Sequence, residues 1–329
     1  MTTPSEMQVV GMTATGGPEV LVAGRRPVPK PQPGEVLVKV AFAGVNGPDL
    51  MQRRGLYPAP EGASVLLGLE VAGEVVAVGE GVTRWNVQDK VCALTNGGGY
   101  AQYCCILADH CLAVPDGLDL AAAASLPEAY FTVWSNIFIG AQLREGEVLL
   151  VHGGAGGLGT AAVQLGRAFG ARVVATDHPA ERCAAVSQLG ASRVIDYEAE
   201  DFVEVVRSEF GGADVVLDIV GGPYIQRNLK VARHDGRIVQ LAFALGSKTQ
   251  VDLMPVMLKR LRYSGSTLRS RPDAFKSEVA KQLQDQVWPL FASGKLRPVA
   301  GTVLPLDQAS EAHRLMESAG HFGKIVLKT

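Results

Sequence analysis

The sequence predicts an α/β protein in which a doubly wound parallel sheet is inserted into a β-rich domain. Three observations give this fold class. The first 125 of 329 residues contain short strand-like runs separated by glycine and proline. From residue 148 onward, apolar strands alternate with helical segments. Near the end, residues 323–328 form one more apolar strand, and we expect the chain to return to the first domain to pair it.

The β-rich domain is predicted from its strands and turns. Residues 35–40 alternate apolar and polar side chains after a proline-rich entry, and residues 70–78 and 90–94 are further strand-like runs. The turns between such runs are supplied by residues 97–99 and 115–117, which are rich in glycine and proline. Short strands with this punctuation favour a compact, barrel-like domain.

The remainder of the chain predicts a parallel sheet with helices on both faces, because buried apolar strands alternate with helices. Six strands are expected, at residues 148–151, 172–176, 194–196, 215–218, 236–241 and 262–266. Helices are expected at residues 121–126, 128–140, 157–169, 179–189, 201–209, 224–231 and 272–293. The predicted domains are residues 1–126, the first part of the β-rich domain; residues 127–268, the parallel sheet; and residues 269–329, the return segment.

The composition excludes several classes of function. The formal net charge is −2, so the chain has no basic field for nucleic acid or anionic lipid. No apolar run approaches the ~18 residues of a membrane span, and the first residues do not form a secretory signal. Five cysteines without a paired C-x-x-C indicate reduced thiols in a reducing compartment. We therefore expect a soluble, cytoplasmic protein that binds neither nucleic acid nor membranes.

A glycine motif carries the chemistry. Gly154, Gly156 and Gly159 match G-x-G-x-x-G between the strand that begins at Val148 and a predicted helix. The three glycines allow a tight turn, a close approach to a pyrophosphate and close packing of helix on strand. With the acidic Asp177 at the end of the next strand, this context predicts a dinucleotide-binding Rossmann domain. The residues expected to contact the cofactor in this loop are Gly154, Ala155, Gly156, Gly157 and Leu158.

The residues after the second strand leave the cofactor open between NAD and NADP. A carboxylate at Asp177 would accept hydrogen bonds from the ribose 2′-hydroxyl of NAD and repel a 2′-phosphate. However, His178, Arg182 and Tyr197 lie close by in the predicted fold and could bind a phosphate. We therefore treat all four residues as candidate cofactor contacts.

Motifs along nearly the whole chain resemble one known family. They are Gly16-Gly-Pro-Glu-Val-Leu21, Pro33-Gly-Glu-Val-Leu-Val-Lys-Val40, Asn46-x-x-Asp-Leu-Met-Gln-Arg53, Gly55-x-Tyr57, Leu67-Gly-Leu-Glu-Val-Ala-Gly73, Gly97-Gly-Gly-Tyr-Ala-Gln102, Ala124-Ser-Leu-Pro-Glu-Ala129 and Gly323-Lys-Ile-Val326. Together they resemble the quinone oxidoreductase (zeta-crystallin-like) branch of the medium-chain dehydrogenase/reductase superfamily. The resemblance implies a GroES-like catalytic domain with an inserted Rossmann domain, and it is greatest to a subgroup whose members reduce ortho-quinones with NADPH.

The resemblance also implies that the protein holds no zinc. Superfamily members with catalytic zinc carry Cys and His where this chain has Asn46 and Leu69, and a third ligand where it has Glu128. One carboxylate cannot replace three ligands, and the four-cysteine structural zinc lobe is missing. The expected chemistry is therefore direct hydride transfer from a nicotinamide to a quinone.

By resemblance, two residues of the first domain are catalytic candidates. Asn46 is expected near the nicotinamide ribose, and Tyr57 at the substrate cleft, where its phenol could bond a carbonyl and donate a proton. NADPH-using relatives carry small residues where this chain has Asp177 and His178, so NADH stays possible although NADPH is favoured. Further cofactor contacts are expected at Thr132, Leu241, Ala242, Phe243, Ser266, Thr267, Leu268 and Lys324.

Two other functions remain open from the sequence. One is NAD(P)H-dependent reduction of activated alkenes, such as enoyl, acrylyl or enone substrates, which needs the same hydride donor. The other is a non-catalytic nucleotide-sensing or structural role. Because residues 262–266 would form an edge strand of the parallel sheet, we also expect a homodimer or a higher homo-oligomer.

Overall fold

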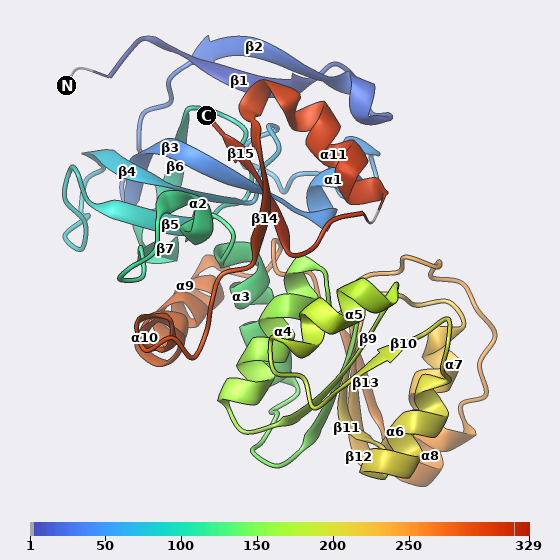
Figure 1. Cartoon of the computed structure of the whole chain (residues 1–329). Coiled ribbons are helices and arrows are strands. Elements are labelled where there is room, and N and C mark those ends of the chain that lie inside the picture. The colour runs from blue at the N-terminus through green and yellow to red at the C-terminus, as the bar shows by residue number, and fades with distance from the viewer. Residues whose placement is uncertain (1–2, 319) are drawn as a thin grey trace. The chain divides into compact units, whose positions relative to one another are not determined.

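The computed structural model describes residues 3–318 and 320–329, which divide into two compact units (Figure 1). One unit comprises Met1–Phe131 together with Arg269–Thr329, and the other comprises Thr132–Leu268. No helix in the described ranges is both long and apolar enough to cross a membrane.

The first unit is built on a seven-stranded sheet, counted over its described residues, with a separate two-stranded ribbon. The sheet runs in the order β14-β15-β3-β4-β5-β7, with β6 paired to β3, while β1 pairs with β2 and makes an isolated bridge from Val9 to Ala101. The strands are β1 (Glu6–Met12), β2 (Leu21–Pro27), β3 (Glu35–Val45), β4 (Glu70–Val78), β5 (Lys90–Leu94), β6 (Tyr103–Leu107), β7 (Cys111–Ala113), β14 (Ala300–Pro305) and β15 (Lys324–Lys328).

The last strand joins the sheet of the first unit, so the two ends of the chain share one core. β15 pairs antiparallel with β3, with Ile325 opposite Val45, and parallel with β14 (Figure 1). Ile325 and Val45 are both fully buried in the core of this unit. The helices of the unit are α1 (Gly47–Arg53), α2 (Leu120–Ala123), α9 (Asp273–Gln282), α10 (Trp288–Ala292) and α11 (Ala309–Glu317), with short 3₁₀ turns at Pro18–Val20, Ala108–His110 and Leu306–Gln308.

The second unit confirms the predicted parallel sheet of six strands, as counted in its described residues. The order is β10-β9-β8-β11-β12-β13, and Leu150 of the central strand is paired with Val174 on one side and Val216 on the other. All three side chains are fully buried. The strands are β8 (Val148–His152), β9 (Arg172–Asp177), β10 (Arg193–Asp196), β11 (Ala213–Asp218), β12 (Ala232–Gln240) and β13 (Arg262–Gly265).

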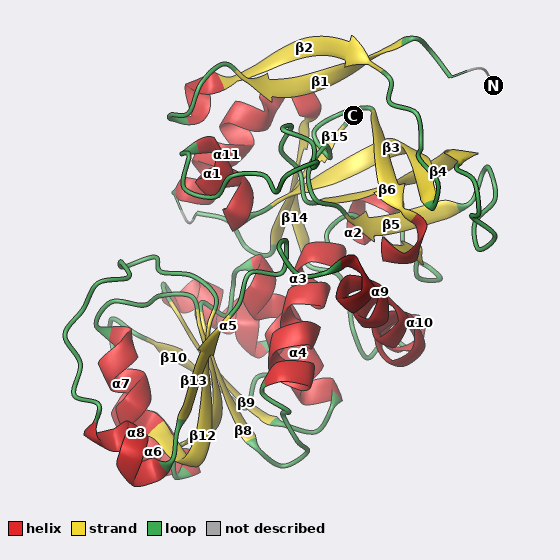
Figure 2. Ribbon diagram, turned by 180° about the vertical axis from the view of Figure 1, so that it is seen from behind, coloured by secondary structure: helices red, strands yellow, loops and turns green. Residues whose placement is uncertain are grey.

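Helices cover both faces of this sheet, as a doubly wound fold requires. Figure 2 shows α4 on one face and α6, α7 and α8 on the other. The helices are α4 (Gly157–Ala168), α5 (Ala180–Ser187), α6 (Phe202–Phe210), α7 (Tyr224–Val231) and α8 (Met254–Lys259). The glycine motif therefore occupies the expected position, between the central strand β8 and α4.

One predicted helix is shorter than expected, and two others are confirmed in extent but contain π-helical turns. The helix expected at 121–126 ends at Ala123, because a residue before a proline is disfavoured in the α conformation and Pro127 follows soon after. The helix expected at 128–140 is α-helical only in α3 (Pro127–Val133) and then turns π-helical over Trp134–Gly140. There, Ser135 Oγ and Asn136 Nδ2 both donate to the Thr132 carbonyl oxygen and compete with the backbone for it.

The helix expected at 272–293 is confirmed over residues 273–292, beginning with α9 (Asp273–Gln282), but it is not α-helical throughout. Its middle, Leu283–Val287, is π-helical, and α10 then begins with Pro289 in its first turn. Proline has no amide hydrogen to donate to the preceding turn, so the regular hydrogen-bond ladder cannot continue through it.

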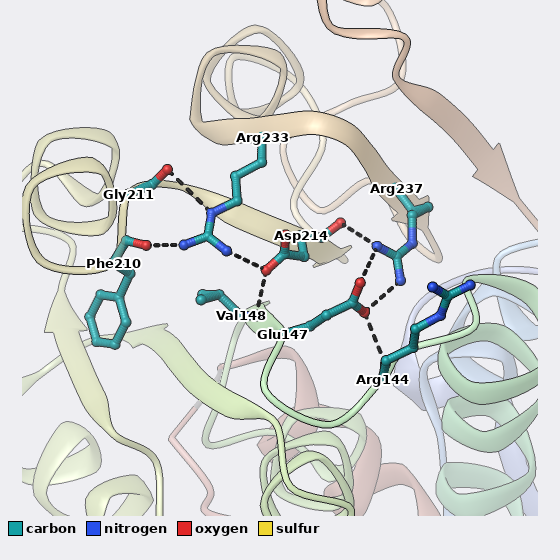
Figure 3. Close-up of polar contacts among 8 residues, drawn as sticks. All are labelled: Arg144, Glu147, Val148, Phe210, Gly211, Asp214, Arg233 and Arg237. Carbon is teal, nitrogen blue, oxygen red and sulfur yellow. Dashed lines mark hydrogen bonds and ion pairs between the residues drawn. The ribbon is translucent and has the colours of Figure 1, made fainter.

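Charged side chains tie three strands of the parallel sheet together at its amino edge (Figure 3). Glu147, just before β8, binds Arg237 of β12 through both carboxylate oxygens, at 2.9 and 2.6 Å. Asp214 of β11 binds Arg233 at 2.7 Å and accepts the Val148 amide at 2.8 Å. This edge is therefore filled by protein contacts, and the polar groups at the opposite, carboxyl edge are the ones available to a ligand.

Candidate functional site

The loop between β8 and α4 has no room for larger side chains. A Cβ added at Gly159 would lie 2.1 Å from the carbonyl oxygen of Gly153, and one at Gly154 would lie 2.9 Å from the Cβ of Ala175. Gly156 caps α4 without a side chain, so no side-chain oxygen covers the first amides of this 12-residue helix. Uncovered amides at a helix amino terminus bind phosphate well, and the loop therefore fits a dinucleotide.

Asp177 lies at the end of β9, and both of its carboxylate oxygens are bonded to other groups of the protein. Its Oδ2 accepts the Ala155 amide of the glycine loop at 2.7 Å, and its Oδ1 accepts the His178 amide at 2.9 Å. The Arg182 Nε lies 2.9 Å from Oδ1, and the Asp177 side chain is only 4% exposed. The negative charge of Asp177 is therefore balanced by the Arg182 guanidinium, and its hydrogen bond from the Ala155 amide fixes the glycine loop.

The neighbouring residues His178 and Asp196 form a hydrogen bond at the same edge of the sheet. His178 Nδ1 lies 2.9 Å from Asp196 Oδ1, and this hydrogen bond holds the pKa of Asp196 below its usual value. The Tyr197 ring lies beside the His178 ring, with 5.5 Å between centroids, and Tyr197 is 42% exposed. Thus the four residues predicted from the phosphate-side sequence, Asp177, His178, Arg182 and Tyr197, lie in one cluster.

The carboxyl ends of β12 and β13 carry the remaining predicted contacts of this unit. Ser266 Oγ donates to Asn136 Oδ1 at 2.6 Å, and Asn136 Nδ2 donates to the Thr132 carbonyl at 2.9 Å. This chain of bonds fixes Thr132 near Ser266, although they are far apart in sequence. The other predicted residues follow the same two strand ends: Leu241, Ala242, Phe243, Thr267 and Leu268.

In the first unit, Asn46 lies in a buried cluster with two charged residues. Asn46 Nδ2 donates to Glu70 Oε1 at 2.9 Å, and Lys324 Nζ binds both Asn46 Oδ1 and Glu70 Oε1. The other oxygen of Glu70 accepts the Glu128 amide at 2.9 Å. Glu70 is fully buried and Lys324 is 5% exposed. Lys324, which by resemblance is expected near the cofactor phosphates, has its ammonium among these partners.

Asp49 fixes the backbone on which Asn46 stands. Its two oxygens accept the Asn46 amide at 2.9 Å and the Gly68 amide at 2.8 Å. With Asn46 as the first capping residue, this forms a capping box at the start of α1. Burial raises the pKa of Asp49 to about 7, although the two amide hydrogen bonds and Lys324 oppose the change.

Tyr57, the second catalytic candidate, lies against a buried cation. The guanidinium carbon of Arg269 is 5.7 Å from the centroid of the Tyr57 ring. Arg269 is held by Gln52 Oε1 at 2.6 Å and by two bonds to the Asn96 carbonyl, at 3.0 and 2.5 Å. Burial lowers the pKa of Arg269, while Asp49 and Tyr57 act in the opposite direction. The hydrogen bonds of Arg269 thus fix the cation beside the Tyr57 ring.

The donor set does not suit zinc. Among the described residues, no group of three or more His, Cys, Asp or Glu side chains is placed to hold a metal ion. The positions expected to carry ligands in zinc-containing members hold Asn46, the buried Leu69 and Glu128. Neither a leucine nor a carboxamide is a usual zinc ligand.

Sequence reasoning missed two residues at these sites, Glu70 and Arg269. Glu70 carried a signal, because it is a charged residue at the start of a valine-rich run that was predicted as a strand. Arg269 directly follows Leu268, a predicted cofactor contact, but nothing in the sequence brings it to Tyr57. That contact depends on the return of the chain to the first unit.

Two family descriptions match the chain, each over part of its length. Residues 32–116 match the alcohol dehydrogenase GroES-like domain, and residues 157–285 match the zinc-binding dehydrogenase family.

Similar proteins cover the whole chain. A quinone oxidoreductase from Sus scrofa is 32% identical over 328 residues, which is 98% of this chain and 97% of that protein. Among solved structures, a mycobacterial protein in complex with NADPH is 30% identical, with a TM-score of 0.86 over 98% of this chain and 100% of that one. The CurK enoyl reductase is 27% identical, with a TM-score of 0.86 over 99% of both chains.

Proposed function

The chain belongs to the quinone oxidoreductase (zeta-crystallin-like) branch of the medium-chain dehydrogenase/reductase superfamily, and from this premise we propose that it reduces quinones with NADPH. Membership makes it an NAD(P)H-dependent oxidoreductase of this superfamily. The quinone acceptor, the preference for NADPH, the independence from zinc and the residue roles below form the proposal.

The observation that carries the quinone proposal is the Tyr57 ring lying on the buried Arg269 guanidinium. Hydride transfer to a quinone leaves an oxyanion, which a phenol can bond and protonate. A fixed cation beside the phenol favours negative charge at that place without any reorganisation. Tyr57 would therefore act as donor to the acceptor carbonyl, and Arg269 would hold its ring.

The cofactor proposal rests on the second unit. When bound, NADPH supplies the hydride. The first amides of α4, which Gly156 leaves without a side-chain cap, would bind the pyrophosphate, while Thr132 and the residues after β12 and β13 would hold the nicotinamide side. In the first unit, Asn46 presents a neutral carboxamide near the expected place of the nicotinamide ribose.

The preference for NADPH is supported by the surroundings of Asp177. Its carboxylate is bonded by the Ala155 amide and paired with Arg182, so its charge is balanced within the protein. Arg182 and His178 bring positive or donor groups to the place where a 2′-phosphate would bind. Asp177 then supports the loop instead of repelling the phosphate.

The second candidate is reduction of an activated alkene. The structural likeness to an enoyl reductase favours it, because that protein shares the fold over nearly the whole chain. A hydride added to a β-carbon leaves an enolate, and the Tyr57 phenol could supply the proton that completes the reaction. A nucleotide-binding protein without catalysis is the third candidate.

Initial-rate oxidation of NADPH and NADH tests these proposals. The acceptors are an ortho-quinone and an α,β-unsaturated ketone, and each reaction is repeated with Tyr57→Phe and after treatment with a chelator. We expect the highest kcat/KM for NADPH with the quinone, a loss of about 10-fold or more in Tyr57→Phe, and no effect of the chelator. Turnover of the alkene alone would select the second candidate, and cofactor binding without turnover would select the third.

We also propose a homodimer formed through β13. This strand is an edge of the sheet in the described residues, and all of its side chains are exposed. The adjoining segment exposes several large apolar side chains: Leu253, Met254, Met257, Leu258 and Tyr263. An open strand edge beside exposed apolar groups favours pairing with a second copy across a two-fold axis.

A further inference from the structure

The carboxamide of Asn46 is hydrogen-bonded at its nitrogen and at its oxygen to side chains of opposite charge. Its Nδ2 donates to Glu70 at 2.9 Å, and its Oδ1 accepts from the Lys324 ammonium. An ammonium can only donate and a carboxylate can only accept, so only one of the two amide orientations satisfies both neighbours. The remaining N–H and lone pair of Asn46 therefore point in fixed directions.

Glu70 is itself fixed by the backbone. Its second oxygen accepts the Glu128 amide at 2.9 Å, and its side chain fills the space beside Gly44. A Cβ added at Gly44 would lie 2.0 Å from Glu70 Oε1, so glycine is needed there for the carboxylate to reach Asn46. The carboxylate thus has a single position.

Glu70 and Lys324 form a buried ion pair. Lys324 Nζ bonds Glu70 Oε1, and the two side chains are 0% and 6% exposed. A buried ion pair of this kind is weak support for stability, because the cost of removing both charges from water offsets their attraction. A role in fixing one conformation accounts for it better.

We propose that Glu70 and Lys324 are positioning residues that act through Asn46, by fixing the orientation of its carboxamide. This inference rests on the proposed function, in which Asn46 lies beside the nicotinamide. It assigns Lys324 to Asn46 instead of to the cofactor phosphates. Glu70 takes no direct part in the proposed reaction. It would affect the rate only through its hydrogen bond with the Asn46 carboxamide.

The test is a double-mutant cycle with a matched control. Glu70→Gln removes the carboxylate of the pair, Asn46→Ala removes the carboxamide, and Glu147→Gln removes the carboxylate that binds Arg237 at the amino edge of the other unit (Figure 3). We expect Glu70→Gln to lower kcat about 10-fold with little change in the KM for the quinone, because a misplaced polar group costs on the order of 1–2 kcal/mol. In the Asn46→Ala background the same change should have less than about a 2-fold effect.

A second measurement does not depend on activity. The side-chain amide signals of Asn46, identified in nitrogen–proton spectra by their loss in Asn46→Ala, should be shifted and slow to exchange while bound to Glu70. They should move in Glu70→Gln and stay in place in Glu147→Gln. Lys324→Arg, which keeps a charged donor, should preserve more of the signal and of kcat than Lys324→Met. If Glu70→Gln does not fold, Glu70→Gln with Lys324→Met removes both charges together and takes its place.

Two results would overturn the inference. One is an equal loss of kcat from Glu70→Gln with and without Asn46, which would mean that Glu70 acts by another route. The other is an unchanged Asn46 amide signal in Glu70→Gln. A different outcome, full activity of Asn46→Ala, would contradict the proposed role of Asn46 in the reaction, while the amide signals would still report whether Glu70 orients it.

Discussion

Asp177 is the residue on which the choice of cofactor depends. By itself, a carboxylate at the end of the second strand predicts NAD. In the folded protein its two oxygens are bonded to the Ala155 and His178 amides and paired with Arg182. The proposed preference for NADPH therefore depends on the pairing of Asp177 with Arg182.

We expect Arg182→Ala to reverse the preference between NADPH and NADH. Without the guanidinium, Asp177 keeps its negative charge and repels a 2′-phosphate, so kcat/KM for NADPH should fall about 10-fold relative to NADH. The measurement is initial rates with both cofactors at a fixed quinone concentration. Arg193→Ala is the control, because it also removes a guanidinium, but one that is paired with Glu200. An equal loss for both cofactors in Arg182→Ala would contradict the prediction.

Arg269 should matter to catalysis through Tyr57. We expect Arg269→Met to lower kcat/KM for the quinone about 5-fold or more, because the ring loses the cation that lies on it. In Tyr57→Phe the same substitution should cost much less. Steady-state rates of the four proteins, with melting temperatures to show that each is folded, measure this coupling.

Arg271→Met is the matched control for Arg269→Met. The guanidinium of Arg271 also lies on an aromatic ring, 3.9 Å from the centroid of Phe275, so its loss removes a cation from a different ring. It should leave the rate with the quinone unchanged. A comparable loss in both variants would show that a general effect on folding, and not the Tyr57 contact, lowers the rate.

At the scale of elements, helices from the two ends of the chain are joined by a buried histidine. His313 of α11 is hydrogen-bonded to Tyr100 Oη at 2.9 Å and to Arg53 of α1 at 3.3 Å. Arg53 also binds Glu317 of α11. Burial and the neighbouring Arg53 lower the pKa of His313 to about 3, so the folded protein holds the neutral form.

This network predicts a specific sensitivity to acid. The unfolded chain binds a proton at His313 near pH 6.5 and the folded protein only near pH 3, so its contribution to stability is complete above pH 6.5 and is lost as the pH falls toward 3. Between pH 6.5 and 5 this histidine should reduce the free energy of unfolding by up to about 2 kcal/mol. Urea unfolding at pH 7.5, 6 and 5 should show a shallower pH dependence in His313→Gln than in the wild type.

The exposed His234 provides the control for this measurement. His234→Gln should keep the wild-type pH dependence, because the hydrogen bonds of His313 to Tyr100 and Arg53 stay in place in this variant. If His313→Gln and His234→Gln showed the same slope, the coupling of the two helices through a neutral His313 would be wrong.

At the scale of the whole molecule, the proposed dimer gives a prediction about assembly. Met257 and Leu258 on α8 are 67% and 60% exposed, so Met257→Asp with Leu258→Asp should not disturb the fold of the unit. In the proposed interface, however, two charges would lie in apolar contacts, and the mass measured by light scattering should fall from dimer to monomer. Val87→Asp, at a side chain 54% exposed in the other unit, should leave the mass unchanged. A monomeric wild type would contradict the proposal directly.

Features that depend on interactions between nearby residues could be predicted from the sequence, and those that depend on distant residues could not. The six parallel strands and the glycine loop follow from local periodicity and from one short motif, and the structure confirms the sheet. The β1–β2 ribbon and the strand β6 were not predicted, because their residues lack a clear alternation of apolar and polar side chains. The π-helical turns were missed for a similar reason, since they depend on single side chains that compete for backbone carbonyls.

The sequence by itself determined that this protein has a Rossmann unit with a dinucleotide loop, because the glycine motif and the strand and helix on either side of it are read from one short segment. Only the tertiary structure decided what the charged residues do. Lys324 meets Asn46 across 278 positions of the chain, and Asp177 meets Ala155 across 22. The packing of segments that are distant in sequence decides which partner neutralises a buried charge. Local sequence patterns therefore cannot predict that partner.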